Sequence, residues 1–212
     1  MTLLADLSAA IIAGDQNTAG ERTRQAIAQG IPPKTVLDDG LVAGMTVVGN
    51  RFRDHDIFLP DVLLAARAMY AGMDLLKPLF IGKGIPSAGT VVIGSVRGDL
   101  HDIGKNLVGI MLRGAGFEVV DLGHDVAPAR MVETARERGA AVIGMSALLT
   151  TTMPAMREVI ELLKQERLDG KVWTIVGGAP VTEAFARSIG ADAYAFDAAN
   201  AVDVVKDLVG RR

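Results

Sequence analysis

A histidine lies between two aspartates in the stretch GDLHDIGKN, residues 98–106. An apolar run ends at Val96 and helical spacing of apolar residues follows the stretch, so it is predicted to lie where a strand gives way to a helix. The Asp99 carboxylate can accept a hydrogen bond from one ring nitrogen of His101, which fixes the tautomer of the ring. The other ring nitrogen would then be available as a base or as a metal ligand.

Two interpretations stay open when this stretch is taken alone. In the first, Asp99 orients His101 for chemistry, and Gly104 lets a bulky group approach the helix that follows. In the second, the stretch is only a polar loop in which Asp102 caps that helix. A phosphate loop is disfavoured, because Asp99 and Asn106 stand where that motif needs glycine and a serine or threonine. The three histidines share no ligand spacing and the chain has no cysteine, so a zinc site is poorly supported.

Two later loops carry residues that could also contact a ligand. SALLTTT, residues 146–152, brings four hydroxyl groups, and a glycine pair stands at 177–178. Each has an ordinary explanation when taken alone: a helix cap for the first, and a turn before Pro180 for the second. All three loops follow predicted strands, and the carboxyl ends of parallel strands meet at one edge of a sheet. Together they favour a ligand site at this edge over three unrelated turns.

The elements that must position these loops differ between the two halves of the chain. Up to about Gly82 the apolar residues recur at helical spacing, and no strand-like alternation is present. One such stripe consists of Val62, Ala66, Met69, Met73, Leu76 and Phe80. The pattern predicts four helices, which need one another to bury their apolar stripes and so form an N-terminal four-helix bundle. Their expected ranges are 2–13, 17–29, 34–53 and 60–81.

From residue 90 onward, short β-branched runs alternate with helical patterns. The runs are at 90–96, 117–123, 140–146, 171–178 and, more weakly, 191–196; the helical patterns are near 103–114, 128–138, 153–166, 180–188 and 198–209. This alternation predicts a flavodoxin-like, Rossmann-like α/β domain whose parallel five-stranded sheet is covered by helices on both faces. The expected strand order is 2-1-3-4-5, with ligands at the switch between strands 1 and 3.

Glycine, proline and serine gather between the two halves, in GKGIPSAGT. This composition is typical of a linker. The predicted organisation is a helical cap domain at 1–83, a linker at 84–88 and an α/β domain at 89–212.

Composition excludes several classes of protein. Half of the 212 residues are apolar, 22% are charged, and the net charge is −3, so a nucleic-acid surface is not expected. No apolar stretch approaches the roughly 18 residues that span a bilayer. The first residues lack the basic region of a signal peptide. With no cysteine in the chain there is no disulfide framework, and a cytoplasmic location is expected.

Three motifs, in this order and at this spacing, resemble the cobalamin-binding domain of methionine synthase and related corrinoid proteins. They are D-x-H-x-x-G at 99–104, S-x-L-x-T at 146–150 and the glycine pair at 177–178. The segment GMTVVGNRFRDHDIFLPDVLLAARAM, residues 44–69, is similar to that family's helical cap. The resemblance covers nearly the whole chain, and the combination is much more specific than the first motif alone.

The resemblance implies that the chain binds cobalamin or a related corrinoid in the base-off/His-on form. His101 matches the histidine that becomes the lower axial ligand of cobalt, and Asp99 matches its hydrogen-bonding partner. Thr152 lies where the family often has a hydroxyl that extends this relay. As cobalt passes from six-coordinate methyl-Co(III) to four-coordinate Co(I), the histidine leaves the metal and its proton affinity changes. The carboxylate and the hydroxyl can supply or absorb that proton.

The resemblance also implies two sets of cofactor contacts. On the lower side, the nucleotide tail of the corrinoid would run between strands 1 and 3, beside Asp99, His101, Asp102, Ile103, Gly104, Ser146, Leu148, Thr150, Gly177 and Gly178. On the upper side, apolar residues of the cap would shield the methyl group, and the matching or neighbouring positions are Met45, Phe52 and Leu59. His124 is expected in a surface loop.

By this resemblance the chain is a methyl carrier. A substrate-specific methyltransferase would load a methyl group from a methylamine, methanol, betaine or methoxyaromatic donor onto Co(I). A second methyltransferase would pass it from methyl-Co(III) to tetrahydrofolate or coenzyme M. With no barrel to bind a donor, the chain would be non-catalytic alone and would act with these partners and a reductive activation protein.

The alternative is a cobalamin-dependent sensor or regulator. Such proteins normally place a DNA-binding winged helix before the cap, whereas this chain begins directly with the cap pattern. The acidic balance of the chain also favours the carrier.

Overall fold

The computed structural model describes residues 2–80 and 87–211, which divide into two compact units. The cap unit comprises Met1–Ser87 with Gly114–Gly116, and the sheet unit comprises Ala88–Arg113 and Phe117–Arg212. Most of the expected linker, 84–88, lies outside the described residues. The predicted domain boundaries therefore stay a prediction.

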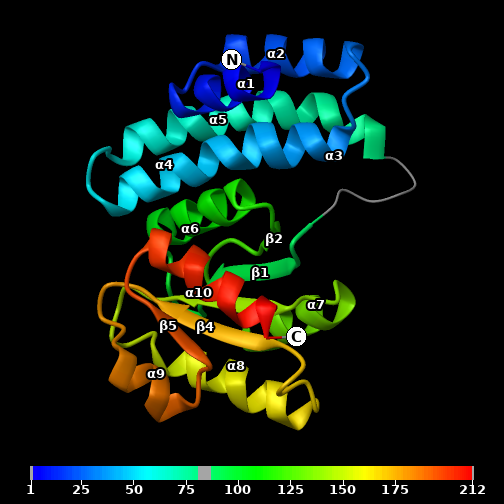
Figure 1. Cartoon of the computed structure of the whole chain (residues 1–212). Coiled ribbons are helices and arrows are strands. Elements are labelled where there is room, and N and C mark those ends of the chain that lie inside the picture. The colour runs from blue at the N-terminus through cyan, green and yellow to red at the C-terminus, as the bar shows by residue number, and fades with distance from the viewer. Residues whose placement is uncertain (1, 81–86, 212) are drawn as a thin grey trace. The chain divides into compact units, whose positions relative to one another are not determined.

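The cap unit is helical, and all four predicted helices are present (Figure 1). The predicted helix 34–53 is continuous but not uniform, because it contains a π-helical segment, η1, between a short first turn and α4. The predicted helix 60–81 includes a 3₁₀ turn, η2, after α5. The elements are α1 (Leu3–Ile12), α2 (Gln16–Ala28), α3 (Pro33–Thr35), η1 (Val36–Val42), α4 (Ala43–Arg53), α5 (Leu59–Leu76) and η2 (Lys77–Phe80).

The predicted apolar stripe of α5 packs inside the cap unit. Val62 and Leu76 are fully buried, and α5 contacts α1, α2 and α4. Gly44 and Gly72 permit close helix packing, because a Cβ at Gly44 would lie 2.7 Å from Ile11 Cβ and one at Gly72 would lie 2.7 Å from Leu41 Cδ2. Small residues at these two positions let the helices approach one another.

The sheet unit contains one parallel five-stranded sheet. Its strands are β1 (Thr90–Ser95), β2 (Glu118–Asp121), β3 (Val142–Ser146), β4 (Trp173–Gly177) and β5 (Ala193–Ala195), in the order β2-β1-β3-β4-β5. The expected strand order is thus confirmed. In the register of the sheet, Ser95, Ser146 and Gly177 lie level with one another, so the loops that follow β1, β3 and β4 begin at the same edge.

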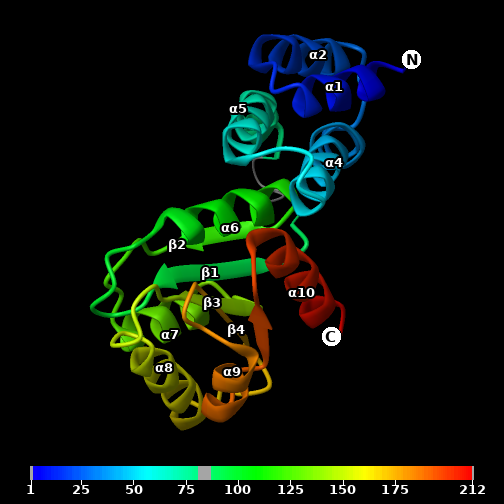
Figure 2. The ribbon, with the colours of Figure 1, turned by 90° about the vertical axis from the view of Figure 1, so that its left-hand side faces the viewer.

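Helices cover both faces of this sheet, as expected. Figure 2 shows α6 (Ile103–Gly114) and α10 (Ala198–Gly210) on one face, with α7 (Pro128–Glu137), α8 (Pro154–Gln165) and α9 (Glu183–Ile189) on the other. The predicted start of the helix 180–188 is wrong by three residues. The Thr182 hydroxyl accepts a hydrogen bond from Phe185 N–H and so caps α9, while Pro180 and Val181 belong to the preceding turn.

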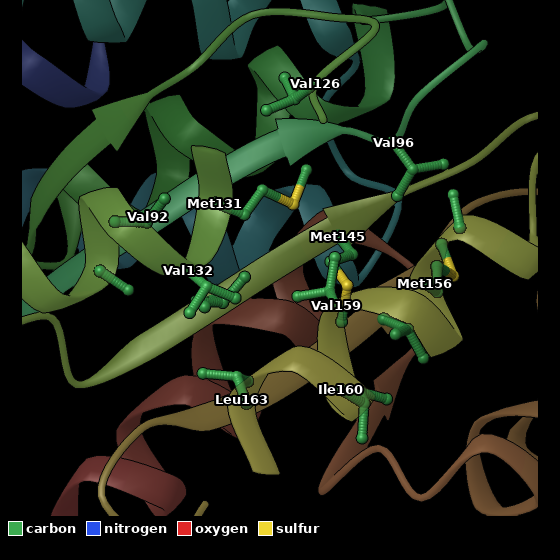
Figure 3. Close-up of a cluster of buried hydrophobic side chains, with 14 of the residues drawn as sticks. Val92, Val96, Val126, Met131, Val132, Met145, Met156, Val159, Ile160 and Leu163 are labelled. Carbon is green, nitrogen blue, oxygen red and sulfur yellow. The ribbon is translucent and has the colours of Figure 1, made fainter. Parts of the chain in front are cut away.

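A hydrophobic core of the sheet unit lies where α7 and α8 pack on the sheet (Figure 3). Met131 of α7 and Met156 of α8 are fully buried, as are Val92 of β1 and Ile143 of β3. Strand β1 is apolar and buried along almost its whole length, which fits a strand covered on both faces. This packing fixes the strand whose carboxyl end carries Asp99.

None of the helices in the described residues is long and apolar enough to cross a membrane.

Candidate functional site

The candidate site lies where the strand order of the sheet reverses. The loop after β1 leads to α6 on one face, and the loop after β3 leads to α8 on the other. Backbone ends that diverge in this way leave room for a ligand between them. Two of the predicted motifs, 99–104 and 146–150, belong to these two loops.

Asp99 joins the two loops. Its side chain is fully buried, and it accepts five hydrogen bonds. One oxygen, Oδ1, accepts from the His101 backbone N–H (3.1 Å) and lies 2.9 Å from His101 Nδ1. The other, Oδ2, accepts from Leu148 N–H (2.7 Å), Leu149 N–H (3.2 Å) and Thr152 Oγ1 (2.7 Å). The carboxylate therefore holds His101 with one oxygen and the β3–α8 loop with the other.

These donors keep Asp99 ionised. Burial alone would raise the pKa of the carboxyl, but the hydrogen bonds from Thr152, Leu148 and His101 outweigh it and hold the pKa of Asp99 well below its usual range. Because the pKa is lower in the folded state, this contribution to stability is fully present above about pH 4 and is lost only as pH falls through the folded value. Asp99 thus presents a fixed negative charge to His101 at neutral pH.

His101 is held at its backbone and at one ring nitrogen. The Ser95 hydroxyl donates to the His101 carbonyl oxygen (2.6 Å), and Asp99 accepts from Nδ1. No other described residue makes a hydrogen bond to the ring, whose side chain is 51% exposed. With Nδ1 donating to an ionised carboxylate, the lone pair of the neutral imidazole is on Nε2, the nitrogen that does not contact Asp99. The arrangement is that of an oriented nitrogen ligand.

Thr152 is the hydroxyl of this cluster. Its Oγ1 lies 2.7 Å from Asp99 Oδ2 and 2.8 Å from the Leu149 carbonyl oxygen, and the residue is almost fully buried. A hydroxyl has one proton, so it can donate to only one of these oxygens at a time. The predicted contact between Thr152 and Asp99 is present, and it gives the hydroxyl two alternative acceptors.

The surroundings of His101 are open and apolar. Leu100 and Ile103 are 66% and 74% exposed, and Leu148 and Leu149 are each 43% exposed. A Cβ built on Gly104 would meet nothing within 4 Å, apart from its own helix. Exposed apolar side chains that gather on neighbouring loops are typical of a surface that another molecule covers. A half-exposed imidazole among apolar side chains and open space fits a large, flat and partly apolar group such as a corrin.

Two of these exposed side chains were missing from the predicted set. Leu100 stands between Asp99 and His101, and Leu149 follows Leu148. Each occupies an unspecified position of its motif, and its exposure depends on loop conformation, so nothing in the sequence alone distinguishes these two leucines from core residues.

The glycine pair has a reason within the fold. A Cβ on Gly177 would lie 3.0 Å from the Ala195 carbonyl oxygen, and one on Gly178 would lie only 1.9 Å from the Ala147 carbonyl oxygen. Gly178 also has a φ of +126°, which L side chains rarely adopt. Gly177 lets the ends of β4 and β5 come together, and Gly178 lets the segment after β4 approach the segment after β3. Their predicted contact with a nucleotide tail stays a prediction.

Substituting Gly178 is expected to destabilise the sheet unit. Gly178→Ala should lower the free energy of unfolding by more than about 2 kcal/mol, because the backbone must move to relieve both the clash and the strained φ. Urea denaturation followed by the fluorescence of Trp173, the only tryptophan and a residue of β4, measures this unit. Gly104→Ala is the control: its Cβ enters open space, so unfolding of the cofactor-free protein should change by less than about 1 kcal/mol.

The remaining predicted residues lie in both units. Ser146 ends β3, Thr150 is exposed in the loop that follows it, and Asp102 and Ile103 lead into α6. In the cap unit, Met45 is a buried residue of α4, and Phe52 and Leu59 are half-buried, near the end of α4 and at the start of α5. That these three shield the upper side of a cofactor stays a prediction.

Lys105 belongs to a second polar cluster. In the sequence it suggested only a phosphate loop, and that interpretation was disfavoured. Its side chain is 3% exposed, and Nζ donates to both carboxylate oxygens of Asp121 and to Asn106 Oδ1, each at 2.6 Å. Asp121 ends β2. The ion pair therefore ties the first turn of α6 to the edge strand of the sheet.

The other two histidines make no hydrogen bond to Asp99 or His101 among the described residues. His124 is exposed in the β2–α7 loop, as expected, and His55 is exposed in the turn between α4 and α5. Across residues 2–80 and 87–211 there is no group of three or more histidine, aspartate or glutamate side chains that could hold a metal ion.

Comparisons with known proteins identify the family of the chain. Two family models, both described as a B12 binding domain, match residues 3–77 and 89–206. The chain is 45% identical to dimethylamine corrinoid protein 1 of Methanosarcina acetivorans, over 98% of this chain and 97% of that one. It is 41% identical to corrinoid protein DSY3155 of Desulfitobacterium hafniense, over 100% and 99%.

A solved structure gives the same result. The methanol:cobalamin methyltransferase complex MtaBC of Methanosarcina barkeri contains a chain that superposes with a TM-score of 0.91 at 33% identity, covering 99% of this chain and 80% of that one. Both units of the present chain are thus matched by B12-binding models, and its full length is matched by corrinoid proteins. The chain belongs to the family of cobalamin-binding corrinoid proteins of methyltransferase systems.

Proposed function

We propose that the chain is a methyl carrier that binds cobalamin in the base-off form, with His101 Nε2 as the lower axial ligand of cobalt. The observation that carries this proposal is the half-exposed His101 imidazole, whose Nδ1 is held by the fully buried carboxylate of Asp99. A surface histidine without a ligating role has no need of a buried, ionised partner, which is costly to desolvate. Orientation of a ligand ring through its second nitrogen is the usual reason for such a pair.

The cofactor, when bound, supplies the cobalt that accepts and gives up the methyl group. The residues of the chain orient the ligand nitrogen and adjust the proton at Nδ1. The ionised Asp99 carboxylate accepts from Nδ1 and so stabilises the proton on that nitrogen, which leaves Nε2 available for coordination. The Thr152 hydroxyl can donate its proton to Asp99 Oδ2 when the negative charge on that carboxylate is larger. It can donate to the Leu149 carbonyl oxygen when the negative charge on the carboxylate is smaller.

The donor that we propose is a methylated amine. Support comes from the dimethylamine corrinoid protein, which is 45% identical over nearly the full length of both chains, while the methanol-system structure is 33% identical. The carrier would receive the methyl group from an amine-specific methyltransferase and deliver it to a second methyltransferase that acts on tetrahydrofolate or coenzyme M. A reductive activation protein would return oxidised cofactor to the active state. A cytoplasmic location also stays a prediction.

The test begins with protein purified without cofactor, mixed with hydroxocobalamin and desalted. We expect one corrinoid to be retained per chain, with the absorption spectrum of a histidine-ligated cobalt. After chemical reduction, dimethylamine and a dimethylamine:corrinoid methyltransferase should change the spectrum to that of methylated cofactor. Methanol with its own methyltransferase is the control and should react at least about tenfold more slowly, since carriers discriminate through their partners. Loss of all corrinoid on desalting would refute the carrier function, and faster reaction with methanol would refute the donor.

A further inference from the structure

The loop between β2 and α7 lies alongside the loop that carries His101. Ser95 N–H donates to the Gly123 carbonyl oxygen and Val126 N–H donates to the Ser95 carbonyl oxygen, each at 3.0 Å. Val96 and Val126 then form an isolated parallel bridge. The chain after β2 therefore continues beside β1 beyond the end of the sheet, up to the residues where the His101 loop begins.

Asp125 makes the last contacts of this loop. Its backbone N–H donates to the Asp99 carbonyl oxygen at 2.9 Å, and its carboxylate Oδ1 accepts from Gly98 N–H at 2.7 Å. The two bonds hold the Gly98–Asp99 dipeptide at both of its ends. Since the direction of the Asp99 side chain depends on the dihedral angles of this dipeptide, Asp125 restricts where the Asp99 carboxylate can point.

The conformation of Asp125 supports a specific role for these contacts. Its φ is +53°, a region that non-glycine residues seldom adopt and that aspartate and asparagine tolerate best. The side chain is exposed, so it adds nothing to the core. A strained and exposed residue is better explained by the two bonds that it makes than by packing.

We propose that Asp125 is a positioning residue for the Asp99–His101 pair, and that it fixes the direction in which His101 presents Nε2. Asp125 makes no hydrogen bond to His101 itself; it acts through Gly98 and Asp99. Its effect on the cofactor rests on the proposed function, but its effect on the ring of His101 does not. Gly98, with a φ of +82°, gives this segment freedom that Asp125 would remove.

Two substitutions separate the effect of the Asp125 carboxylate from the effect of its backbone conformation. Asp125→Asn keeps both an acceptor oxygen and tolerance of the left-handed region, whereas Asp125→Gly keeps only the conformation. Arg167→Gly is the matched control, because Arg167 also has a left-handed φ, +56°, but lies in the turn after α8, away from the loops that follow β1 and β3. Any general effect of adding a glycine at a left-handed position will be present in both glycine variants.

The first measurement uses the cofactor-free protein. Nitrogen-15 NMR of the His101 ring should show the Nδ1–H tautomer in the unmodified protein and in Asp125→Asn, and a mixture of tautomers in Asp125→Gly. Amide exchange of Gly98 should accelerate about tenfold in Asp125→Gly, as for loss of one hydrogen bond to a charged acceptor, and less than about threefold in Asp125→Asn and Arg167→Gly. An unchanged tautomer and unchanged Gly98 exchange in Asp125→Gly would overturn the proposal.

The second measurement uses protein loaded with cobalamin. The ratio of histidine-ligated to unligated cofactor, read from absorption spectra at pH 7, should fall about tenfold in Asp125→Gly and be retained in Asp125→Asn. A lower urea midpoint in Asp125→Gly with an unchanged ratio would reduce Asp125 to a structural residue and also overturn the proposal. If even the unmodified protein lacks a histidine-ligated spectrum, the proposed function fails, whereas the tautomer and exchange data still decide the role of Asp125.

Discussion

Replacing His101 with alanine is expected to abolish nitrogen ligation of bound cobalamin. The His101 imidazole is hydrogen-bonded to Asp99, whose carboxylate holds Nδ1 at 2.9 Å and leaves Nε2 free to bind a metal. Alanine removes this ligand and leaves the spectrum of a cofactor without a nitrogen below the cobalt. Retention of the cofactor should weaken by about 100-fold or more, since loss of an orienting partner alone typically costs 10- to 100-fold. The spectrum and the affinity are both measured by titration with hydroxocobalamin.

The control for His101→Ala is His124→Ala. His124 is also an exposed histidine at this edge of the sheet unit, in the loop after β2, but it makes no hydrogen bond to Asp99. Its removal should leave the spectrum unchanged. A further variant, His101→Gly, should regain a nitrogen-ligated spectrum when free imidazole is added, because the space of the ring is then available to the ligand. A histidine-ligated spectrum in His101→Ala without imidazole would show that another residue holds the cobalt.

The sheet unit could be predicted in detail because its signals are local. Apolar β-branched runs alternate with helical spacing, and this alternation leaves few possible topologies. The contact between Asp99 and His101 could also be predicted, because the two residues are separated by only one position. The predicted start of α9 was wrong because proline is compatible both with a turn and with the first residue of a helix. The Thr182 cap decides between these two possibilities for Pro180.

The less predictable part of the site depends on contacts between distant segments. The backbone N–H groups of Leu148 and Leu149 reach Asp99 across about 50 residues, which the sequence cannot show without the register of β1 and β3. The partners of Asp125 and Asp121 could not be predicted either, since nothing in the segments around these two residues identifies Gly98 or Lys105 as the partner. Sequence motifs thus predicted the candidate ligand His101 and its hydrogen-bonding partner Asp99, while the residues that hold them in place became recognisable only in three dimensions.

Breaking the ion pair between Lys105 and Asp121 is expected to have a large effect on stability. Asp121→Ala is expected to lower the free energy of unfolding of the sheet unit by about 3 kcal/mol, because it leaves a buried ammonium group with only Asn106 Oδ1 as acceptor. The position of Lys105 adds to this cost, since the first turn of a helix carries a partial positive charge. Asp121 also accepts from Gly123 N–H, so the β2–α7 loop loses a contact as well. Urea denaturation followed by Trp173 fluorescence measures the change.

Removing Lys105 is expected to destabilise the sheet unit less than removing Asp121. Lys105→Met keeps most of the buried stem and leaves a carboxylate whose side chain is 26% exposed and can be hydrated, so it should cost only about 1 kcal/mol. The double variant Lys105→Met with Asp121→Ala should then be more stable than Asp121→Ala alone, because no unpaired charge remains inside. Equal losses in the two single variants, or a double variant whose loss is the sum of both, would mean that the cost of a buried charge does not govern this contact. The pair would then act through loop geometry, by way of the Asp121 bond to Gly123.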